Sequence, residues 1–287
     1  MNTTGLVLAI GAALAFAGFD VTRKQVTEHL EPLALSAWLA LGSLPFLSGW
    51  CLVAGWAWTP AWLGPGLASV LVQGLATVVF LTALRIAPLS RTVPFLALTP
   101  VLSAVVGWLG LGELPRPWSW VGMVLVTGGA FALALDRAPG QDGKLRVEKG
   151  SLLASLVALL WSASAVIDKR ALDAANPPTH ALLSTLGVFL LFTLERSLRG
   201  GLRSLALPRV AALRLLGAAV FGSAALGLQL SAFGYAQVSA VETVKRAVGG
   251  FAALVIGRIA FREVVHLRAV LAVGVMTVGT GLVLLGP

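Results

Sequence analysis

Residues 87–113 read APLSRTVPFLALTPVLSAVVGWLGLGE, and residues 238–263 read VSAVETVKRAVGGFAALVIGRIAFRE. Each stretch opens with polar residues, continues as a long apolar run and ends on a glutamate. Aligning the segments ALRIAPLSRTVPF and AFGYAQVSAVETV places Ser90 on Ser239. The chain therefore contains two copies of one unit.

The repeat extends over the whole chain. Residues 15–24, AFAGFDVTRK, align with residues 161–170, WSASAVIDKR, and both segments end an apolar run in a charged cluster. The most polar linker lies where the two copies join. We place the first five-helix repeat at residues 1–137, the linker at 138–149 and the second repeat at 150–287.

The composition indicates an integral membrane protein. Hydrophobic residues make up 57% of the 287 residues and charged residues 11%, with a mean hydropathy of +0.90. Ten apolar runs are long enough to cross a bilayer as helices. Since five helices per copy is an odd number, the copies enter the membrane from opposite sides, as an inverted repeat. The ten spans are residues 4–22, 33–54, 63–84, 89–111, 118–135, 151–168, 179–195, 212–233, 240–261 and 267–285.

Several classes of site are not indicated by the sequence. The first apolar run has no basic residues before it, so we predict a retained helix rather than a signal peptide. The single cysteine, Cys51, excludes an intrachain disulfide, and His29, His180 and His266 are too scattered to suggest a metal or nucleophile site. No GxxxxGK[ST] motif is present, so ATP hydrolysis is not the expected energy source. We expect no cofactor, no metal and no nucleic-acid partner, and the charge of +9 is assigned to membrane anchoring.

The two quoted stretches, together with WSASAVIDK at 161–169, resemble the drug/metabolite transporter superfamily, in particular its EamA-like branch of ten-helix transporters. The resemblance implies an all-α fold with two inverted five-helix repeats around a central cavity. It also implies a monomer or homodimer in the inner membrane that moves a small organic solute by alternating access. It does not identify the solute, because members carry amino acids, sugars, nucleotide sugars and phosphorylated metabolites.

Lys and Arg residues are distributed unequally between the two sides of the membrane. Sixteen lie in or beside the loops that follow the odd-numbered spans, and three, Arg116, Lys169 and Arg170, lie on the other side. Because cytoplasmic loops carry the excess of positive charge, we predict that both termini lie outside the cytoplasm. The family more often has cytoplasmic termini and a basic loop where this chain has the uncharged segment AGWAWTPAW at 54–62. The sixteen residues are Arg23, Lys24, Arg85, Arg91, Arg137, Lys144, Arg146, Lys149, Arg196, Arg199, Arg203, Arg209, Arg214, Arg258, Arg262 and Arg268.

The segment VETVKR places three charges near the start of the ninth span. Ser239 followed by Glu242 has the spacing of a capping box, which accounts for Glu242 without a role in transport. Lys245 and Arg246 lie about 9–10 Å deeper at 1.5 Å per residue, where a cation facing lipid is costly. Glu242 can neutralise either cation but not both, so one cation is left for another partner.

We expect Lys245 and Arg246 to face the cavity and to bind an anionic group of the solute. The alternative is that both long side chains extend to the nearby membrane surface. The resemblance supports the first interpretation, because a Lys-Arg pair in this helix is similar to the pair that holds phosphate in the sugar-phosphate transporters of the superfamily. The repeat partners of this pair, residues 95–97, are apolar, so the cavity is expected to be charged on one side only.

Other polar and aromatic residues are weaker candidates for solute binding. Gln73 and Gln229 lie in equivalent spans and suit either solute contacts or hydrogen bonds between helices. Tyr235 lies near a helix end, where an interfacial role is also expected. Trp161 and Asp168 match positions that often face the cavity in the family, although Asp168 also fits a water-exposed helix end.

Helix ends and helix breaks receive simpler interpretations. Pro94 and Pro100 interrupt the fourth span, where the freed carbonyls either line the cavity or accompany a kink. Glycines of the eighth and tenth spans, including Gly274, Gly279 and Gly281, favour close helix packing. We expect solvated charges at four helix ends: Glu113, Glu263, Lys169 and Arg170.

The function best supported by the sequence is secondary transport of a small organic metabolite, anionic or zwitterionic. Two alternatives within the membrane are a flippase for a lipid-linked phosphate and a broad-range metabolite or drug exporter. An intramembrane enzyme would need a catalytic constellation at mid-membrane depth, and none is visible in the sequence. An assembly subunit would not need a buried cation pair. Glu242 is the one deep carboxylate expected to carry a proton.

Overall fold

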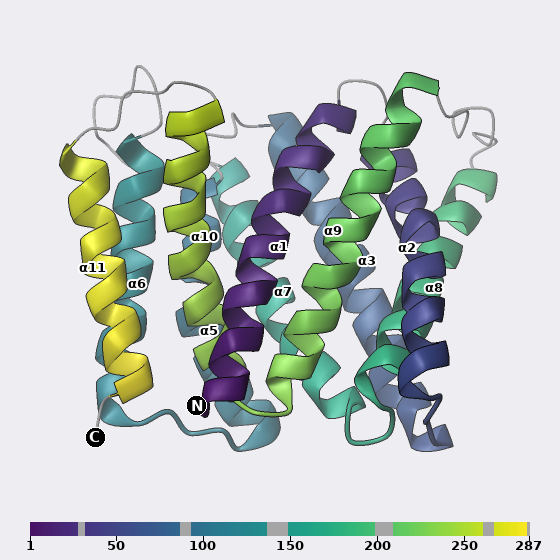
Figure 1. Ribbon diagram of the computed structural model, residues 1–287, viewed down its shortest axis with the longest axis horizontal. Helices are drawn as coiled ribbons and strands as arrows, with labels where there is room; N and C mark the ends of the chain where they lie inside the picture. The colour runs from purple at the N-terminus through teal and green to yellow at the C-terminus, as the bar shows by residue number, and fades with distance from the viewer. Residues whose placement is uncertain (28–31, 87–92, 137–148, 199–208, 261–266, 286–287) are drawn as a thin grey trace.

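The structure is a computed structural model that describes residues 1–27, 32–86, 93–136, 149–198, 209–260 and 267–285. Ser90, Glu263, His29, His266, Arg137 and residues 138–148 of the linker lie outside this part, so the repeat boundaries stay a prediction. The described residues form ten α-helices and two 3-10 helices (Figure 1). They are α1 (Thr3–Thr27), α2 (Pro32–Ala54), η1 (Pro60–Trp62), α3 (Leu63–Ile86), η2 (Val93–Leu98), α5 (Thr99–Leu111), α6 (Pro117–Asp136), α7 (Lys149–Ala171), α8 (Pro177–Leu198), α9 (Arg209–Phe233), α10 (Val238–Ala260) and α11 (Leu267–Leu285).

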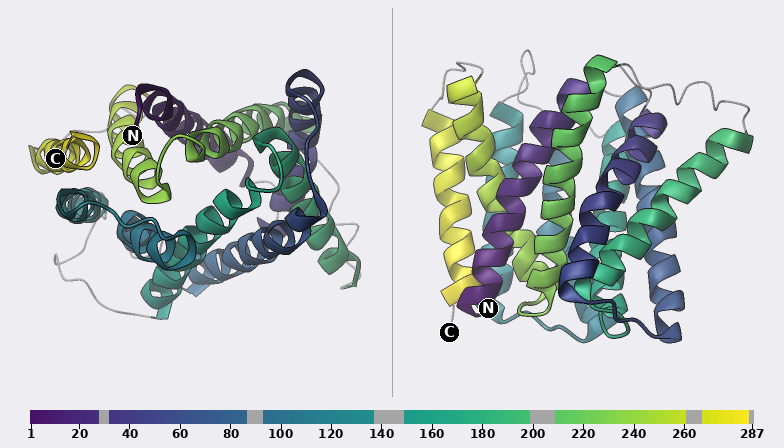
Figure 2. Two further views of the ribbon diagram at one scale, coloured as in Figure 1. Left: turned by 90° about the horizontal axis from the view of Figure 1, so that it is seen from below. Right: turned by 45° about the vertical axis from the view of Figure 1, so that its right-hand side comes forward.

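The packing of these helices repeats itself with inverted symmetry. α1 packs against α9 and α10, and α7, the equivalent of α1, packs against α3 and α5. α2 packs against its own equivalent α8, and α6 packs against its own equivalent α11. Figure 2 shows α1, α9 and α10 along one side of the molecule, here called the α1 row, and α3, α5 and α7 along the other, the α7 row. The predicted pair of inverted five-helix repeats is confirmed.

Both ends of the chain lie on one face of the bundle, here called the terminus face (Figure 1). Seven helices of the described part are long and apolar enough to cross a membrane. The apolar parts of α5 and α6 are shorter, and α10, which carries four charged residues, is not among the seven. Large apolar side chains point outward along the bundle, where a soluble protein would carry polar ones. The helices therefore present a surface suited to lipid. Examples more than half exposed are Leu52, Val53, Leu71, Leu109, Leu213 and Leu271.

Helices α6 and α11 approach each other through glycine. A Cβ atom on Gly279 would lie 2.6 Å from the carbonyl oxygen of Gly122, and a Cβ atom on Gly122 would lie 2.3 Å from that of Gly279. A larger residue at either position would force the two helices apart. The packing interpretation is thus correct for Gly279. It is wrong for Gly274 and Gly281, which have nothing within 4 Å of a Cβ position.

Candidate functional site

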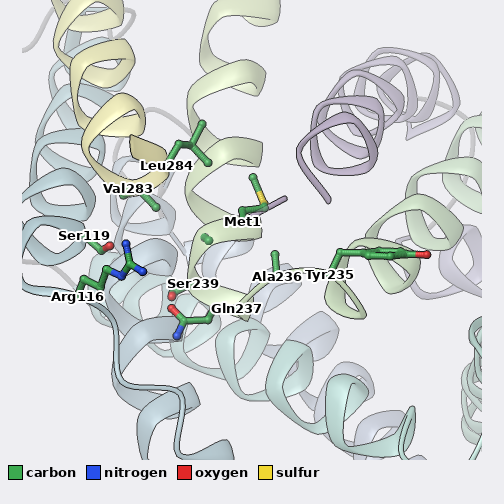
Figure 3. A pocket seen from close by; sticks show the side chains of 10 residues that line it. Met1, Arg116, Ser119, Tyr235, Ala236, Gln237, Ser239, Val283 and Leu284 are labelled. Carbon is green, nitrogen blue, oxygen red and sulfur yellow. The ribbon is translucent and has the colours of Figure 1, made fainter. Parts of the chain in front are cut away.

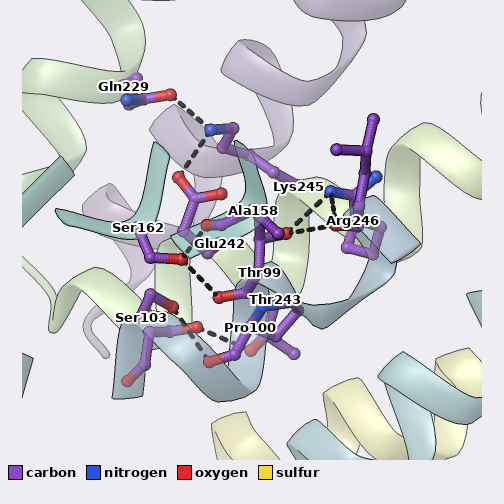
Figure 4. A network of polar contacts seen from close by, with 12 residues as sticks. Thr99, Pro100, Ser103, Ala158, Ser162, Gln229, Glu242, Thr243, Lys245 and Arg246 are labelled. Atoms are coloured by element: carbon purple, nitrogen blue, oxygen red, sulfur yellow. Dashed lines mark hydrogen bonds and ion pairs between the residues drawn. The ribbon is translucent and has the colours of Figure 1, made fainter. Parts of the chain in front are cut away.

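The centre of the site is the ammonium group of Lys245, which has partners from three helices. Its Nζ lies 2.7 Å from Glu242 Oε1 and also donates a hydrogen bond to Gln229 Oε1 of α9 (Figure 4). The ring of Phe16 in α1 lies beneath it, with the ring centroid 4.7 Å from Nζ. The side chains of Lys245 and Glu242 are 16% and 13% exposed. Lys245 is therefore held inside the α1 row by a carboxylate, an amide and an aromatic face.

Arg246 reaches the opposite row. Its Nη2 donates to the carbonyl oxygen of Leu96 at 2.6 Å and to Thr99 Oγ1 at 2.7 Å. In an α-helix the Leu96 carbonyl would accept from the N–H of residue 100, but Pro100 has no N–H. Pro100 therefore adds no competing donor to this carbonyl, which belongs to the 3-10 helix η2 and is bonded to Arg246; that the carbonyl lines a cavity stays a prediction. Lys245 and Arg246 both form hydrogen bonds within the protein, so their side chains do not extend to the membrane surface.

Thr99 connects this contact to α7. Its backbone carbonyl accepts a hydrogen bond of 3.3 Å from Ser162 Oγ, while its own hydroxyl donates to the Leu96 carbonyl at 3.1 Å (Figure 4). The polar cluster consequently contains groups from both sequence repeats and from both rows. The positive side chains all come from α10, and the opposite row contributes neutral hydroxyls and carbonyls.

The start of α10 differs from the predicted capping box. The helix begins at Val238, with Gln237 accepting its first backbone hydrogen bonds, so Ser239 lies inside the first turn. Glu242 is directed to Lys245 instead of back to the helix start. The helix is capped by Glu113, whose Oε2 accepts from the Val238 N–H at 2.9 Å. A carboxylate from the segment after α5 satisfies this end, which a local sequence motif does not reveal.

The predicted solvated helix ends are wrong at Glu113 and Lys169. Lys169 Nζ lies 2.5 Å from Glu113 Oε1 and donates to the Ala236 carbonyl at 2.7 Å, and the two side chains are only 23% and 15% exposed. The expectation is correct for Arg170, which is 67% exposed on the surface and pairs with Asp173 at 3.5 Å. A partly buried ion pair thus lies at the terminus face.

Asp168 is not a water-exposed helix end either, because it is buried in a chain of hydrogen bonds. Trp62 Nε1 donates to His180 Nδ1 at 3.0 Å, His180 Nε2 lies 3.2 Å from Asp168 Oδ1, and Ser69 Oγ donates to the same oxygen. The residue types are those of a hydrolase triad, but the order differs. The serine bonds to the carboxylate and not to the histidine, so no base is positioned to activate it.

The remaining predicted site residues do not join the central cluster. Tyr235 is 51% exposed and lines a cavity of about 300 Å³ at the terminus face, together with Met1, Arg116 and Gln237 (Figure 3). Trp161 packs against Phe80 of α3, with ring centroids 5.4 Å apart. Gln73 is partly buried in α3, and no hydrogen bond to its side chain is recorded within the described residues.

Residues missed by the sequence analysis provide much of the site. Thr99 and Ser162 are hydroxyls within apolar runs, and Phe16 is one of twelve phenylalanines, so none stands out. The Leu96 carbonyl is the exception. A proline four residues after an apolar residue in a helix marks a free carbonyl, and this signal locates the partner of Arg246.

Comparison with known proteins places the chain in a family. Residues 3–135 and 148–285 both match the EamA-like transporter family. An uncharacterized transporter of Bacillus subtilis (strain 168), YwfM, is 28% identical over 137 residues, which are 47% of this chain and 46% of that protein. A riboflavin transporter of Rhizobium johnstonii (strain DSM 114642 / LMG 32736 / 3841) is 32% identical over 124 residues, 42% of this chain and 40% of that protein. The matched segments span less than half the length of these curated relatives.

A solved structure described as "Crystal structure of protein" has the same fold. Its TM-score is 0.77 over 98% of this chain and 96% of that chain, at 16% sequence identity. The family match covers both repeats, and the fold is that of a multi-pass membrane protein. The chain therefore belongs to the EamA-like transporter family.

Proposed function

We propose that this protein is a secondary transporter, and not an enzyme, that moves a small organic metabolite with an anionic or phosphorylated group by alternating access. The observation that carries the proposal is Arg246. Its hydrogen-bond acceptors, the Leu96 carbonyl and the Thr99 hydroxyl, are neutral, whereas Lys245 is neutralised by Glu242. Glu242 and Asp20 attract Arg246 by Coulombic interaction, without a hydrogen bond to it within the described residues. Among the residues that the structure describes, no carboxylate is bonded to Arg246, and an arginine of this kind within a membrane span is suited to an anionic ligand.

The geometry of the guanidinium supports a ligand role. Within the described residues, the recorded hydrogen bonds of Arg246 leave from Nη2, so N–H groups of Nε and Nη1 remain to donate to a solute oxygen. Because Arg246 joins α10 of the α1 row to η2 and α5 of the α7 row through Nη2, an anion bound at Nε and Nη1 would act on the same side chain that links the two rows. Solute binding and row movement would then be linked at one side chain.

We also propose that the protein lies in the inner membrane with its terminus face outside the cytoplasm. Arg23, Lys149 and Arg268 lie at helix ends away from the terminus face, in agreement with the charge distribution of the sequence.

A thermal-shift panel on purified protein tests the proposed solute class. A ligand that binds only the folded state raises stability by about 2.7 kcal/mol at a concentration of 100 Kd. Riboflavin and riboflavin 5′-phosphate form a matched pair differing in one phosphate, and organic monophosphates, carboxylates and neutral sugars complete the panel. We expect anionic members to stabilise the parent, and Arg246→Ala to weaken that response about 10- to 150-fold. Arg170→Ala, at an exposed position of the terminus face, is the control. An Arg246→Ala protein that responds like the parent would contradict the anion site, and stabilisation by a polyprenyl phosphate alone would favour a flippase.

A further inference from the structure

The cavity at the terminus face shares no lining residue with the central cluster around Lys245 and Arg246. Its volume of about 300 Å³ lies at the lower end of the range for small-molecule sites, so it has room for a compact group. The starts of α6 and α10 and the end of α11 meet around it. The residues that matter here are Arg116, Ser119, Gln237, Ser239, Val283 and Leu284 (Figure 3).

Ser239 is a buried hydroxyl that lines this cavity. The residue is 4% exposed, and within the part of the chain that the structure describes its Oγ makes no recorded hydrogen bond. A buried hydroxyl without a partner is costly. Ser239 is the second residue of α10, so no earlier turn of the helix offers it a carbonyl. Three other buried serines each donate to a carbonyl of the preceding turn of their helix: Ser103, Ser162 and Ser223.

Arg116 brings a positive charge to the same cavity. Its backbone carbonyl accepts from the N–H groups of Ser119 and Trp120, so Arg116 stands at the N-terminal end of α6. The helix macrodipole makes this end positive, and the start of α10 beside Ser239 is positive for the same reason. In Figure 3 the guanidinium of Arg116 is directed toward the side of the cavity where Ser119 and Ser239 lie. The cavity therefore gathers a cation, two hydroxyls and the positive ends of two helices.

No acidic side chain offsets this charge among the described residues that line the cavity. Glu113, which caps α10 at the Val238 N–H, has its charge met by Lys169 at 2.5 Å. The side chain of Gln237 donates to the Leu114 carbonyl at 3.4 Å, so its amide is held at the rim. The polar lining is thus suited to a negatively charged group with several oxygen acceptors.

We propose that this cavity binds a phosphate group, held by the guanidinium of Arg116 and the hydroxyls of Ser119 and Ser239. A guanidinium matches two phosphate oxygens at once, and the hydroxyls can donate to others. The starts of α6 and α10 add the attraction of helix N-termini for phosphate. The site goes beyond the proposed transport function, because it requires neither Arg246 nor a transported solute.

Two kinds of molecule carry this group: a phospholipid and a soluble phosphate ester. α11 packs on α6 and α10 at one end of the bundle, and its apolar side chains include Val278, 61% exposed, and Leu285, 85% exposed (Figure 2). Val283 and Leu284 of the same helix border the cavity. A headgroup bound there would leave its acyl chains along the lipid-facing side of α11. This position favours a phospholipid headgroup over a soluble ester.

Thermal shift of the full chain in a neutral detergent tests the site with three probes. Phosphatidic acid and diacylglycerol form a matched pair that differs in one phosphate, and glycerol 3-phosphate carries the phosphate without acyl chains. We expect phosphatidic acid to stabilise the parent more than diacylglycerol does. Arg116→Ala should weaken binding about 10- to 150-fold, the loss expected for a hydrogen bond to a charged group.

Ser239→Ala separates a ligand role from a structural one. Because the hydroxyl has no recorded partner in the protein, this variant should melt at the parent temperature without a probe and bind phosphatidic acid several-fold more weakly. A lower melting temperature with unchanged binding would assign the hydroxyl to the fold and overturn the site. The control is Arg170→Ala, which removes an exposed cation of the same face and should bind like the parent.

The remaining outcomes also decide the proposal. A response to glycerol 3-phosphate alone, weakened in Arg116→Ala and Ser239→Ala, supports the site and identifies a soluble ligand. Equal responses to phosphatidic acid and diacylglycerol, with none to glycerol 3-phosphate, overturn it. A phosphate response that is lost in Arg246→Ala and kept in Arg116→Ala overturns it as well, because the phosphate then binds at the central cluster. Should Arg116→Ala fail to fold, the binding measured for Ser239→Ala decides.

Discussion

Lys169 Nζ lies 2.5 Å from Glu113 Oε1 and 2.7 Å from the carbonyl oxygen of Ala236, so one ammonium group joins the end of α7 to the turn before α10. Glu113 in turn accepts from the Val238 N–H at 2.9 Å. α5 and α7 belong to the α7 row and α10 to the α1 row. This contact therefore links the two rows at the terminus face, and a movement of one row against the other at this face would break it.

The first prediction concerns the strength of this closure. Glu113→Gln and Lys169→Met should each lower the free energy of unfolding by about 1–3 kcal/mol, because each leaves one partly buried charge without its partner. The double variant should lose less than the sum of the two single variants, since neither charge is then left unpaired. Denaturation of the four proteins in one detergent measures the cycle.

The matched control for this cycle is the exposed pair formed by Arg170 and Asp173. Arg170→Gln should change stability by no more than a few tenths of a kcal/mol, because surface pairs contribute little. Additive losses for Glu113→Gln and Lys169→Met would show that the two side chains do not act together.

The second prediction concerns Pro100. The Leu96 carbonyl already accepts from Arg246 Nη2 and from Thr99 Oγ1, which use both of its lone pairs. Pro100→Ala would add a helical N–H as a third donor, and one of the three bonds would have to give way. We expect anionic ligands of the thermal-shift panel to bind with a several-fold change in affinity, smaller than the loss in Arg246→Ala. Pro65→Ala in the first turn of α3 is the control, since a proline there displaces no helical hydrogen bond. An unchanged affinity in Pro100→Ala would show that the helix break does not affect anion binding.

The fold was predictable because each of its main features has a local signal in the sequence. Bilayer thickness fixes the length of an apolar span, and the spans and their repeat can be counted along the chain. The break at Pro100 also follows from covalent structure, since proline has no N–H to donate. These features required no knowledge of which helices are neighbours.

The partners of the charged side chains were not predictable in the same way. Glu242 has the spacing of a local cap, yet it bonds to Lys245, and the cap comes from Glu113 in a distant part of the sequence. Asp168 looked exposed because Lys169 and Arg170 follow it, whereas Ser69 and His180 bury it. Which carboxylate faces water is decided by packing between helices, and packing has no signal in a single sequence.

The third prediction concerns the Lys245–Glu242 pair. Glu242→Gln should destabilise the protein by about 1–3 kcal/mol, because Lys245 keeps its charge but retains only the Gln229 amide and the Phe16 ring as partners. The double variant Glu242→Leu/Lys245→Met, which buries neither charge, should recover much of that loss. Thermal unfolding of the single and double variants measures the loss and its recovery.

If Glu242 carries a coupling proton, a pH gradient imposed on proteoliposomes should drive uptake of a panel ligand in the parent and not in Glu242→Gln.

The fourth prediction concerns orientation in the membrane. In the sequence, sixteen Lys and Arg residues lie in or beside the segments that follow the odd-numbered spans and three lie in or beside the other segments, and positively charged loops are retained in the cytoplasm. Both chain ends lie on the terminus face, so a reporter fused after Pro287 should be active only if it is a type that works outside the cytoplasm (Figure 1). The same reporter fused after Arg199, between α8 and α9 in the sequence, should be inactive.

Activity of a cytoplasm-only reporter at Pro287 would show the opposite orientation, and the Lys169–Glu113 contact would then lie on the cytoplasmic side. Lys169 and Arg170 are two of the three basic residues assigned to the terminus face. Lys169→Met should leave the orientation unchanged, because it removes a positive charge from this face and so enlarges the charge difference between the two sides of the membrane.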